Sequence, residues 1–171
     1  LIRISQWQSR EAMRDEITAS FVAESVAVAR VLDDAAVIAG DFRIDPAGHL
    51  RFAVSVAPQT GERRIGRIVQ RLCEIETYKT MSMLGFSRVR RLADQIGALD
   101  NNLTGLMVDM TTGATPADET LPQLLSISAE LESMAARNAF RFSATGAYQA
   151  IVDQRIAALR ESRVSGRQTF A

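Results

Sequence analysis

The sequence has only one cysteine, one histidine and one tryptophan among its 171 residues. A single cysteine, Cys73, excludes a disulfide bond within the chain, and this residue together with His49 cannot make a structural zinc site. The sequence also lacks a glycine-rich phosphate loop and, after Leu1, the pattern of a signal peptide. With no catalytic signature in the sequence, a non-enzymatic role is favoured, and we expect no cofactor and no metal.

An excess of charge of either sign is also missing, since twenty basic residues balance twenty acidic ones. Non-specific binding to nucleic acid depends on a positive excess, so we expect no nucleic-acid partner. Apolar residues make up 47% and charged residues 23% of the chain, which is typical of a globular protein and not of a disordered or membrane-spanning one. The ends at Leu1 and Ala171 carry no terminal signal, and we interpret the chain as the middle piece of a larger protein.

The first sixty residues predict a short helix and a small antiparallel sheet. Apolar spacing over residues 7–21 predicts a helix that Ser9 caps. β-branched, alternating patterns predict strands over residues 22–31, 35–44 and 50–57, separated by turns at Asp33-Asp34 and at residues 45–48. Residues 1–4 are a candidate for a further strand.

One face of this sheet is expected to be apolar and the other to face water. The residues predicted for the apolar face are Ile38, Phe42, Ile44, Leu50, Phe52, Val54 and Val56. Those predicted to point into water are Arg43, Asp45, Arg51 and Ser55.

From residue 62 the apolar period becomes that of a helix and continues to residue 110. The heptad seam consists of Val89, Leu92, Ile96, Leu99, Leu103, Leu106 and Met110, the pattern of a coiled coil. A helix of this length spans roughly 70 Å and needs a partner. The partner is a second helix. It is indicated by a break at residues 112–116, a capping box from Thr120 to Gln123, and a second apolar run that has an interruption near residues 138–143.

The fold class that follows is α+β: a small antiparallel β-meander with a short helix, then a long antiparallel, coiled-coil-like α-helical hairpin. We expect a partial α/β region at residues 1–60 and the hairpin at residues 61–171. If the chain turns back at about residue 115, residues whose numbers sum to about 231 face each other to within one helical turn.

This register brings together one polar cluster. Its members are Glu74, Glu76, Tyr78, Arg141, Tyr148 and Arg155. Paired carboxylates beside tyrosine and arginine could hold a metal or transfer protons. The alternative, which we favour, is that Glu76 and Arg155 form an ion pair between the helices that fixes their register.

The same register places a group of basic residues at one end of the hairpin. The group, to which Arg63 also belongs, comprises Arg64, Arg67, Arg71, Arg160, Arg163 and Arg167. Such a group could bind anionic lipid head groups or an acidic partner. The alternative is a solvated face partly neutralised by Glu62, Asp153 and Glu161.

Several stretches of the chain resemble a bacterial family of uncharacterised membrane-anchored proteins, classified as a domain of unknown function. The stretches are Asp41-Phe42-Arg43-Ile44-Asp45, residues 66–72, residues 74–79, and residues 141–145 through Tyr148 and Arg155 to residues 166–169. The resemblance implies a longer protein in which this soluble piece precedes a C-terminal membrane anchor. It implies no activity.

Two functional hypotheses remain. The first is a non-enzymatic interaction or scaffold module at the cytoplasmic face of the inner membrane, which binds a protein partner or a second copy through the hairpin. The second is a ligand-binding or enzymatic α/β domain that the hairpin supports, with a site around Glu76, Tyr78, Tyr148 and Arg155. A pocket lined by these four residues would favour the second hypothesis, and an exposed apolar stripe would favour the first.

Overall fold

A computed structural model describes residues 1–7, 9–113, 116–164 and 166–170. The chain divides into two compact units. Unit 1 comprises Leu1–Thr77 and Ile151–Ala171, and unit 2 comprises Tyr78–Ala150. The division that we predicted, into an α/β region at residues 1–60 and a hairpin at residues 61–171, stays a prediction.

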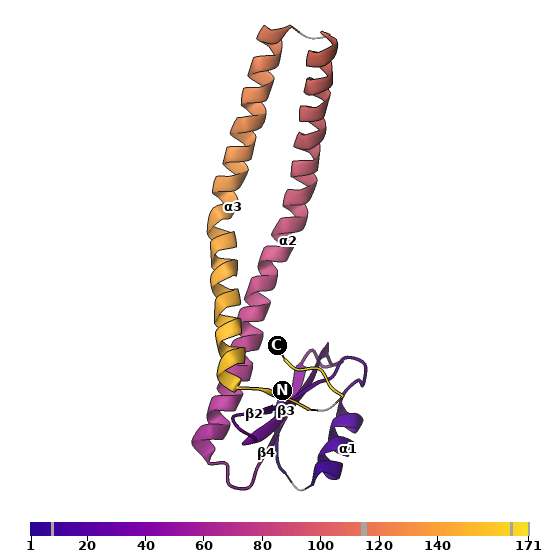
Figure 1. Cartoon of the computed structure of the whole chain (residues 1–171), viewed down its shortest axis with the longest axis vertical. Helices are drawn as coiled ribbons and strands as arrows, with labels where there is room; N and C mark the ends of the chain where they lie inside the picture. The colour runs from indigo at the N-terminus through magenta and orange to yellow at the C-terminus, as the bar shows by residue number, and fades with distance from the viewer. Residues whose placement is uncertain (8, 114–115, 165, 171) are drawn as a thin grey trace. The chain divides into compact units, whose positions relative to one another are not determined.

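The fold is α+β, with a sheet followed by two long helices, as the sequence predicts (Figure 1). The elements before the long helices are β1 (Ile2–Gln6), α1 (Arg10–Ser20), β2 (Ala27–Val31), β3 (Ala36–Ile44) and β4 (Leu50–Val56). They are followed by α2 (Glu62–Thr112), α3 (Ala117–Leu159) and β5 (Ser162–Arg163). The structure confirms the three predicted strands and the strand at the start of the chain. It also confirms that Ser9 caps α1, because Ser9 Oγ accepts a hydrogen bond from Ala12 N at 3.0 Å.

The sheet of unit 1 has the strand order β1-β4-β3-β2-β5. Strands β2, β3 and β4 form the predicted antiparallel meander. Strand β1 adds to β4 in parallel, and β5 adds to β2 in antiparallel orientation. The segment after α3 therefore returns to the sheet, where Val28 N donates to Gln168 O at 2.8 Å.

Both faces of the sheet are covered, so the prediction that one face points into water is wrong. Helix α1 packs on the face that carries Val28, Val37 and Ala53. Ser55, which we expected in water, is buried, and its hydroxyl lies 3.3 Å from that of Ser5, a neighbour of Glu16 on α1. Sequence alternation identifies two faces of a strand but does not reveal which later or earlier element covers each.

The opposite face packs against the parts of α2 and α3 that belong to unit 1. Ile38 and Val54 on this face are fully buried, as are Ile68, Leu72 and Leu159 on the helices. Leu32 N donates to Leu159 O at 2.9 Å, which ties the end of α3 to the turn between β2 and β3. The apolar face predicted from Ile38 and Val54 is thus the face on which the helices rest.

A β-bulge between Gly40 and Ile44 moves the end of β3 out of the predicted pattern. Phe42 has a φ of 55°, and Ile44 is 72% exposed, so the prediction that Ile44 joins the apolar face is wrong. The bulge brings the Phe42 ring edge-on to those of Phe52 and Phe170, at centroid distances of 6.2 and 5.4 Å. Gly40 pairs with Phe52 whereas Ile44 pairs with Leu50, so the regular pairing of β3 with β4 is interrupted between these two positions.

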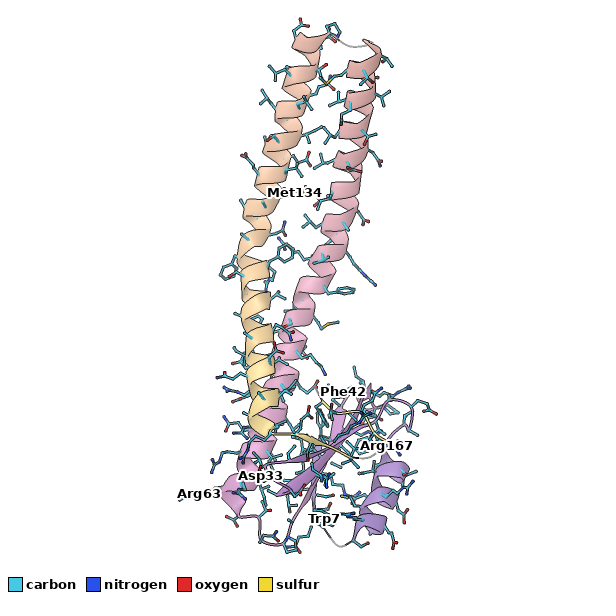
Figure 2. The ribbon with its side chains drawn as sticks, viewed as in Figure 1. Trp7, Asp33, Phe42, Arg63, Met134 and Arg167 are labelled. Atoms are coloured by element: carbon cyan, nitrogen blue, oxygen red, sulfur yellow. The ribbon has the colours of Figure 1, made fainter. Side chains whose placement is uncertain are left out.

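Unit 2 is a hairpin made from the second part of α2 and the first part of α3. Leu99, Leu106 and Met134 are buried, and Figure 2 shows Met134 between the two helices. The predicted seam is buried only in part, because Val89, Ile96 and Met110 are exposed. We conclude that a two-helix contact covers a narrower stripe than the heptad pattern offers.

Two predicted features of α3 are wrong. The helix is continuous from Ala117 to Leu159, with no interruption at residues 138–143. Asn138 is compatible with the buried helix because its amide donates to Met134 O at 2.6 Å and accepts from Arg88 Nε at 2.9 Å. Thr120 does not cap the helix, since it lies within it and donates its hydroxyl to Pro116 O at 3.0 Å.

Candidate functional site

The register of the two helices agrees with the prediction to within about one and a half turns. In unit 1, Arg155 Nε donates to Glu74, and Arg71 donates to Ala158 O at 2.7 Å. In unit 2, the rings of Tyr78 and Tyr148 stack at a centroid distance of 5.8 Å. Glu74, about half a turn before Glu76, takes the position opposite Arg155 that we predicted for Glu76.

The residues of the predicted polar cluster are divided between the two units. Glu74, Glu76 and Arg155 belong to unit 1, whereas Tyr78, Arg141 and Tyr148 belong to unit 2. Within unit 1, Glu76 borders a cavity of about 280 Å³ beside Phe52, Leu72 and Cys73, on another side of α2 from Glu74. Among the described residues, no three metal-binding side chains cluster.

The pKa of Glu74 is lowered, first by the hydrogen bond from Gln70 at 2.8 Å and then by the hydrogen bond from Arg155. A lowered pKa means that Glu74 stabilises the fold above its ordinary value of 4.5, and that this stabilisation is lost as the pH falls through the lowered pKa. We expect Glu74→Gln to lower the stability at pH 7. In urea unfolding at a series of pH values, the difference from the wild type should begin to shrink as the pH falls below 4.5 and should vanish once the pH is below the lowered pKa. A difference that is the same at pH 7 and in acid would contradict this assignment.

The residues of the predicted basic end do not all lie on the two helices, because α3 ends before several of them. The helix stops at Leu159, and Arg160 follows with a φ of 47°, so Arg163 and Arg167 are not on a helix. Arg160 pairs with Asp33 at 2.9 Å, and Arg163 Nε donates to Arg167 O at 3.1 Å. Of the predicted group, Arg64 and Arg67 share a shallow surface hollow at the start of α2, together with Arg63.

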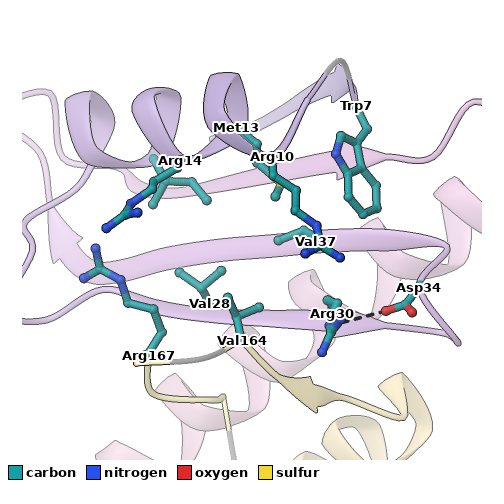
Figure 3. Close-up of a pocket in the computed structure, with 11 residues that line it drawn as sticks. Trp7, Arg10, Met13, Arg14, Val28, Arg30, Asp34, Val37, Val164 and Arg167 are labelled. Carbon is teal, nitrogen blue, oxygen red and sulfur yellow. Dashed lines mark ion pairs between the residues drawn. The ribbon is translucent and has the colours of Figure 1, made fainter.

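A different group of arginines lines a cavity of unit 1, which we call the arginine cleft (Figure 3). Its volume is about 550 Å³, within the range of small-molecule sites. Arginines enter it from three segments of the chain: α1, β2 and the segment after β5. The four arginines are Arg10, Arg14, Arg30 and Arg167.

The walls of the arginine cleft are apolar. They are formed by Trp7, Met13, Ile17, Val28, Val37 and Val164. Trp7 is held at the end of β1 by a hydrogen bond from its backbone N to Val56 O at 2.8 Å. The cleft therefore combines an apolar surface with several guanidinium groups.

The cleft has one acidic lining residue. Asp34 Oδ1 lies 3.4 Å from Arg30 Nε, and Figure 3 marks this ion pair. The sequence indicates part of the cleft, because Arg10, Met13, Arg14 and Ile17 recur at helical spacing. The remaining residues come from distant segments, and a single sequence carries no signal that joins them.

Among the residues that the structure describes, no helix combines the length and apolar character needed to cross a bilayer.

Comparisons with known proteins identify the family but no activity. No curated protein and no solved structure matches the chain. A family model described as "Protein of unknown function (DUF3422)" matches residues 1–171, the whole chain. The chain therefore belongs to DUF3422, a family of proteins of unknown function.

Proposed function

We propose that the chain is a non-enzymatic interaction and scaffold module in which unit 2 binds unit 2 of a second copy. The observation that carries this proposal is the segregation of charge along the hairpin. The other support is the number of large apolar side chains that a two-helix hairpin leaves in solvent.

Unit 2 exposes apolar side chains on both of its helices. On α2 they are Met83, Leu84, Phe86, Val89, Ile96, Met107, Val108 and Met110. On α3 they are Leu121, Leu125, Leu131, Phe140 and Phe142. Apolar surface of this extent on a soluble element is typical of a protein interface.

The charged residues of unit 2 fall into two halves of opposite sign. Residues 92–136, which include the turn, hold seven acidic residues and no lysine or arginine. Residues 78–91 and 137–150 hold six basic residues and no acidic one. The acidic half contains Asp94, Asp100, Asp109, Asp118, Glu119, Glu130 and Glu132, and the basic half contains Lys79, Arg88, Arg90, Arg91, Arg137 and Arg141.

The two segments of the basic half lie side by side in space. Gly85 faces Thr145, and Arg88 Nε donates to Asn138, so residues 78–91 lie beside residues 137–150. Each half also carries some of the exposed apolar side chains, such as Phe86 and Phe142 in the basic half and Ile96 and Leu125 in the acidic half.

A second copy in antiparallel orientation satisfies both features. It places the acidic half of each hairpin along the basic half of the other, and the two contacts are equivalent by two-fold symmetry. A parallel arrangement would instead bring like charges together. In the antiparallel dimer, apolar burial supplies most of the affinity, and the charges select the orientation.

We expect the protein to be dimeric in sedimentation at low salt and to dissociate more readily as the salt concentration rises. Asp100 and Glu132 are exposed and form no ion pair among the described residues. The double variant Asp100→Lys/Glu132→Lys should therefore fold normally while its self-association weakens by roughly tenfold or more. The variant Arg90→Glu/Arg137→Glu should show the same loss.

The decisive measurement is a mixture of these two double variants. Each contact between halves again joins opposite charges in the mixture, so the heterodimer should form with near wild-type affinity. The control is Glu11→Lys, in which lysine replaces an exposed acidic residue on α1, outside unit 2. It should leave self-association unchanged. A wild type that stays monomeric at all concentrations, or a mixture that fails to restore binding, would refute the proposal.

We also propose that the module works at the cytoplasmic face of a bacterial inner membrane, to which a C-terminal anchor in the longer protein holds it. The support is the resemblance of the stretches at residues 41–45, 66–72, 74–79 and 141–169 to membrane-anchored proteins. Fractionation of cells that contain the full-length protein tests this location, and recovery in the soluble fraction would contradict it.

A further inference from the structure

The arginine cleft holds more positive charge than its own acidic residue can balance. Four arginines and one aspartate line it, and Asp34 is engaged with Arg30. Arg10 and Arg14 form no ion pair or hydrogen bond with any described residue. The cleft is therefore a concave, electropositive surface within unit 1.

The arginines of the cleft lie close enough together for their positive charges to repel one another. Arg10 and Arg14 are one turn apart on α1, where like charges repel. Figure 3 shows the side chains of Arg14 and Arg167 reaching toward each other from opposite walls. Arg167 is also anchored, because its Nη1 donates to Ala23 O at 3.3 Å. An anion between the two walls would turn these repulsions into attractions.

The cleft also has donors to offer. The buried Nε of Arg30 is in ion-pair distance of Asp34 but donates no hydrogen bond among the described residues. Guanidinium groups bind carboxylate and phosphate oxygens in a two-pronged geometry. Beside these donors, Trp7, Met13 and Val37 present apolar surface, which a purely inorganic anion would leave uncovered.

We propose that the arginine cleft binds a small amphipathic anion, an alkyl or aryl phosphate or carboxylate. Its head group lies between Arg14 and Arg167, and its apolar body covers Trp7, Met13 and Val37. This site is independent of the hairpin contact proposed above. All residues that line it belong to unit 1.

Trp7 makes the test specific, because it is the only tryptophan in the chain and it lines the cleft. Octyl phosphate, octanoate, octanol and inorganic phosphate are titrated into the protein below their aggregation limits. Trp7 emission and the heat of binding are followed together. Octyl phosphate or octanoate should produce a saturable change in both signals, with an affinity at least about tenfold above that of octanol and of inorganic phosphate.

Arg10→Gln and Arg14→Gln remove charge without breaking a contact and keep a good helix former on α1. Arg14→Gln should weaken binding of octyl phosphate by about tenfold or more, and Arg10→Gln should weaken it in the same direction. Arg63→Gln, at the exposed start of α2 and outside the cleft, is the matched control and should bind as the wild type does.

Three results would overturn the proposal. They are the absence of a saturable signal with both anionic amphiphiles, equal affinity for octanol and octyl phosphate, and wild-type binding by Arg14→Gln. Unchanged unfolding midpoints of the variants establish that any loss of binding is local to the cleft.

Discussion

Leu159→Ala should lower the free energy of unfolding of unit 1 by about 2–5 kcal/mol. Leu159 is the last residue of α3, and its side chain is fully buried with those of Ile38 and Leu72. Truncation to alanine removes three carbon atoms from a fully buried position and leaves a cavity in the core of unit 1. Its backbone oxygen continues to accept from Leu32 N, so the loss reports packing alone.

Urea unfolding followed by Trp7 emission measures this effect, because Trp7 belongs to unit 1. The control is Ile44→Ala, which truncates an aliphatic side chain that is 72% exposed. It should change the stability by no more than about 0.5 kcal/mol. Similar losses in the two variants would mean that α3 does not end in the core of unit 1.

Asp41→Ala should be the second strongly destabilising change, by about 2–4 kcal/mol. The Asp41 side chain is inaccessible to solvent and accepts hydrogen bonds from Val22 N and Arg43 N, each at 3.2 Å. It also lies 3.8 Å from Arg51. Alanine leaves two backbone donors and a guanidinium group without their acceptor, beside the bulge that shapes the end of β3.

Asp41→Asn separates hydrogen bonding from charge. The amide oxygen can still accept from a backbone donor, so Asn should recover a clear part of the stability that Ala loses. Urea unfolding of both variants, again followed by Trp7 emission, makes the comparison. An Asn variant as unstable as the Ala variant would show that the negative charge beside Arg51, and not the pair of backbone bonds, is the main contribution.

The parts of the fold that the sequence predicts are those with a long or regular pattern. Helix α2 is visible because helical apolar spacing persists to Met110, and the meander is visible because its strands are separated by aspartate-rich turns. The helix register could be predicted because two helices joined by a short turn have only one way to lie antiparallel.

The parts that could not be predicted depend on contacts between distant segments. Strand β5 has only two residues, too few to carry a period, and its place in the sheet is decided by hydrogen bonds to β2. For the same reason the sequence alone predicts Arg163 and Arg167 at the end of the hairpin, although they lie beyond the end of α3. The burial of Ser55 depends on Ser5, fifty positions earlier, and no local pattern reports such a pairing.

The charge segregation of unit 2 is a signal that the sequence does contain. The balance of twenty basic and twenty acidic residues over the whole chain conceals it. It becomes visible once charges are counted along the hairpin, where Arg91 is the last basic residue before Arg137. The arginine cleft is only half visible in the same way, because Arg10 and Arg14 share a helix face while Arg30 and Arg167 reach it from elsewhere.

Unit 2 is inserted in the sequence between the two segments of unit 1, and this affects the order in which the units can fold during synthesis. Unit 2 is one continuous stretch, whereas unit 1 is assembled from two stretches that unit 2 separates. During synthesis, which proceeds from the N-terminus, the hairpin has all of its residues by Ala150. Unit 1 at that moment still lacks Leu159, β5 and Phe170, so its core stays unfinished for as long as the ribosome takes to translate residues 151–171.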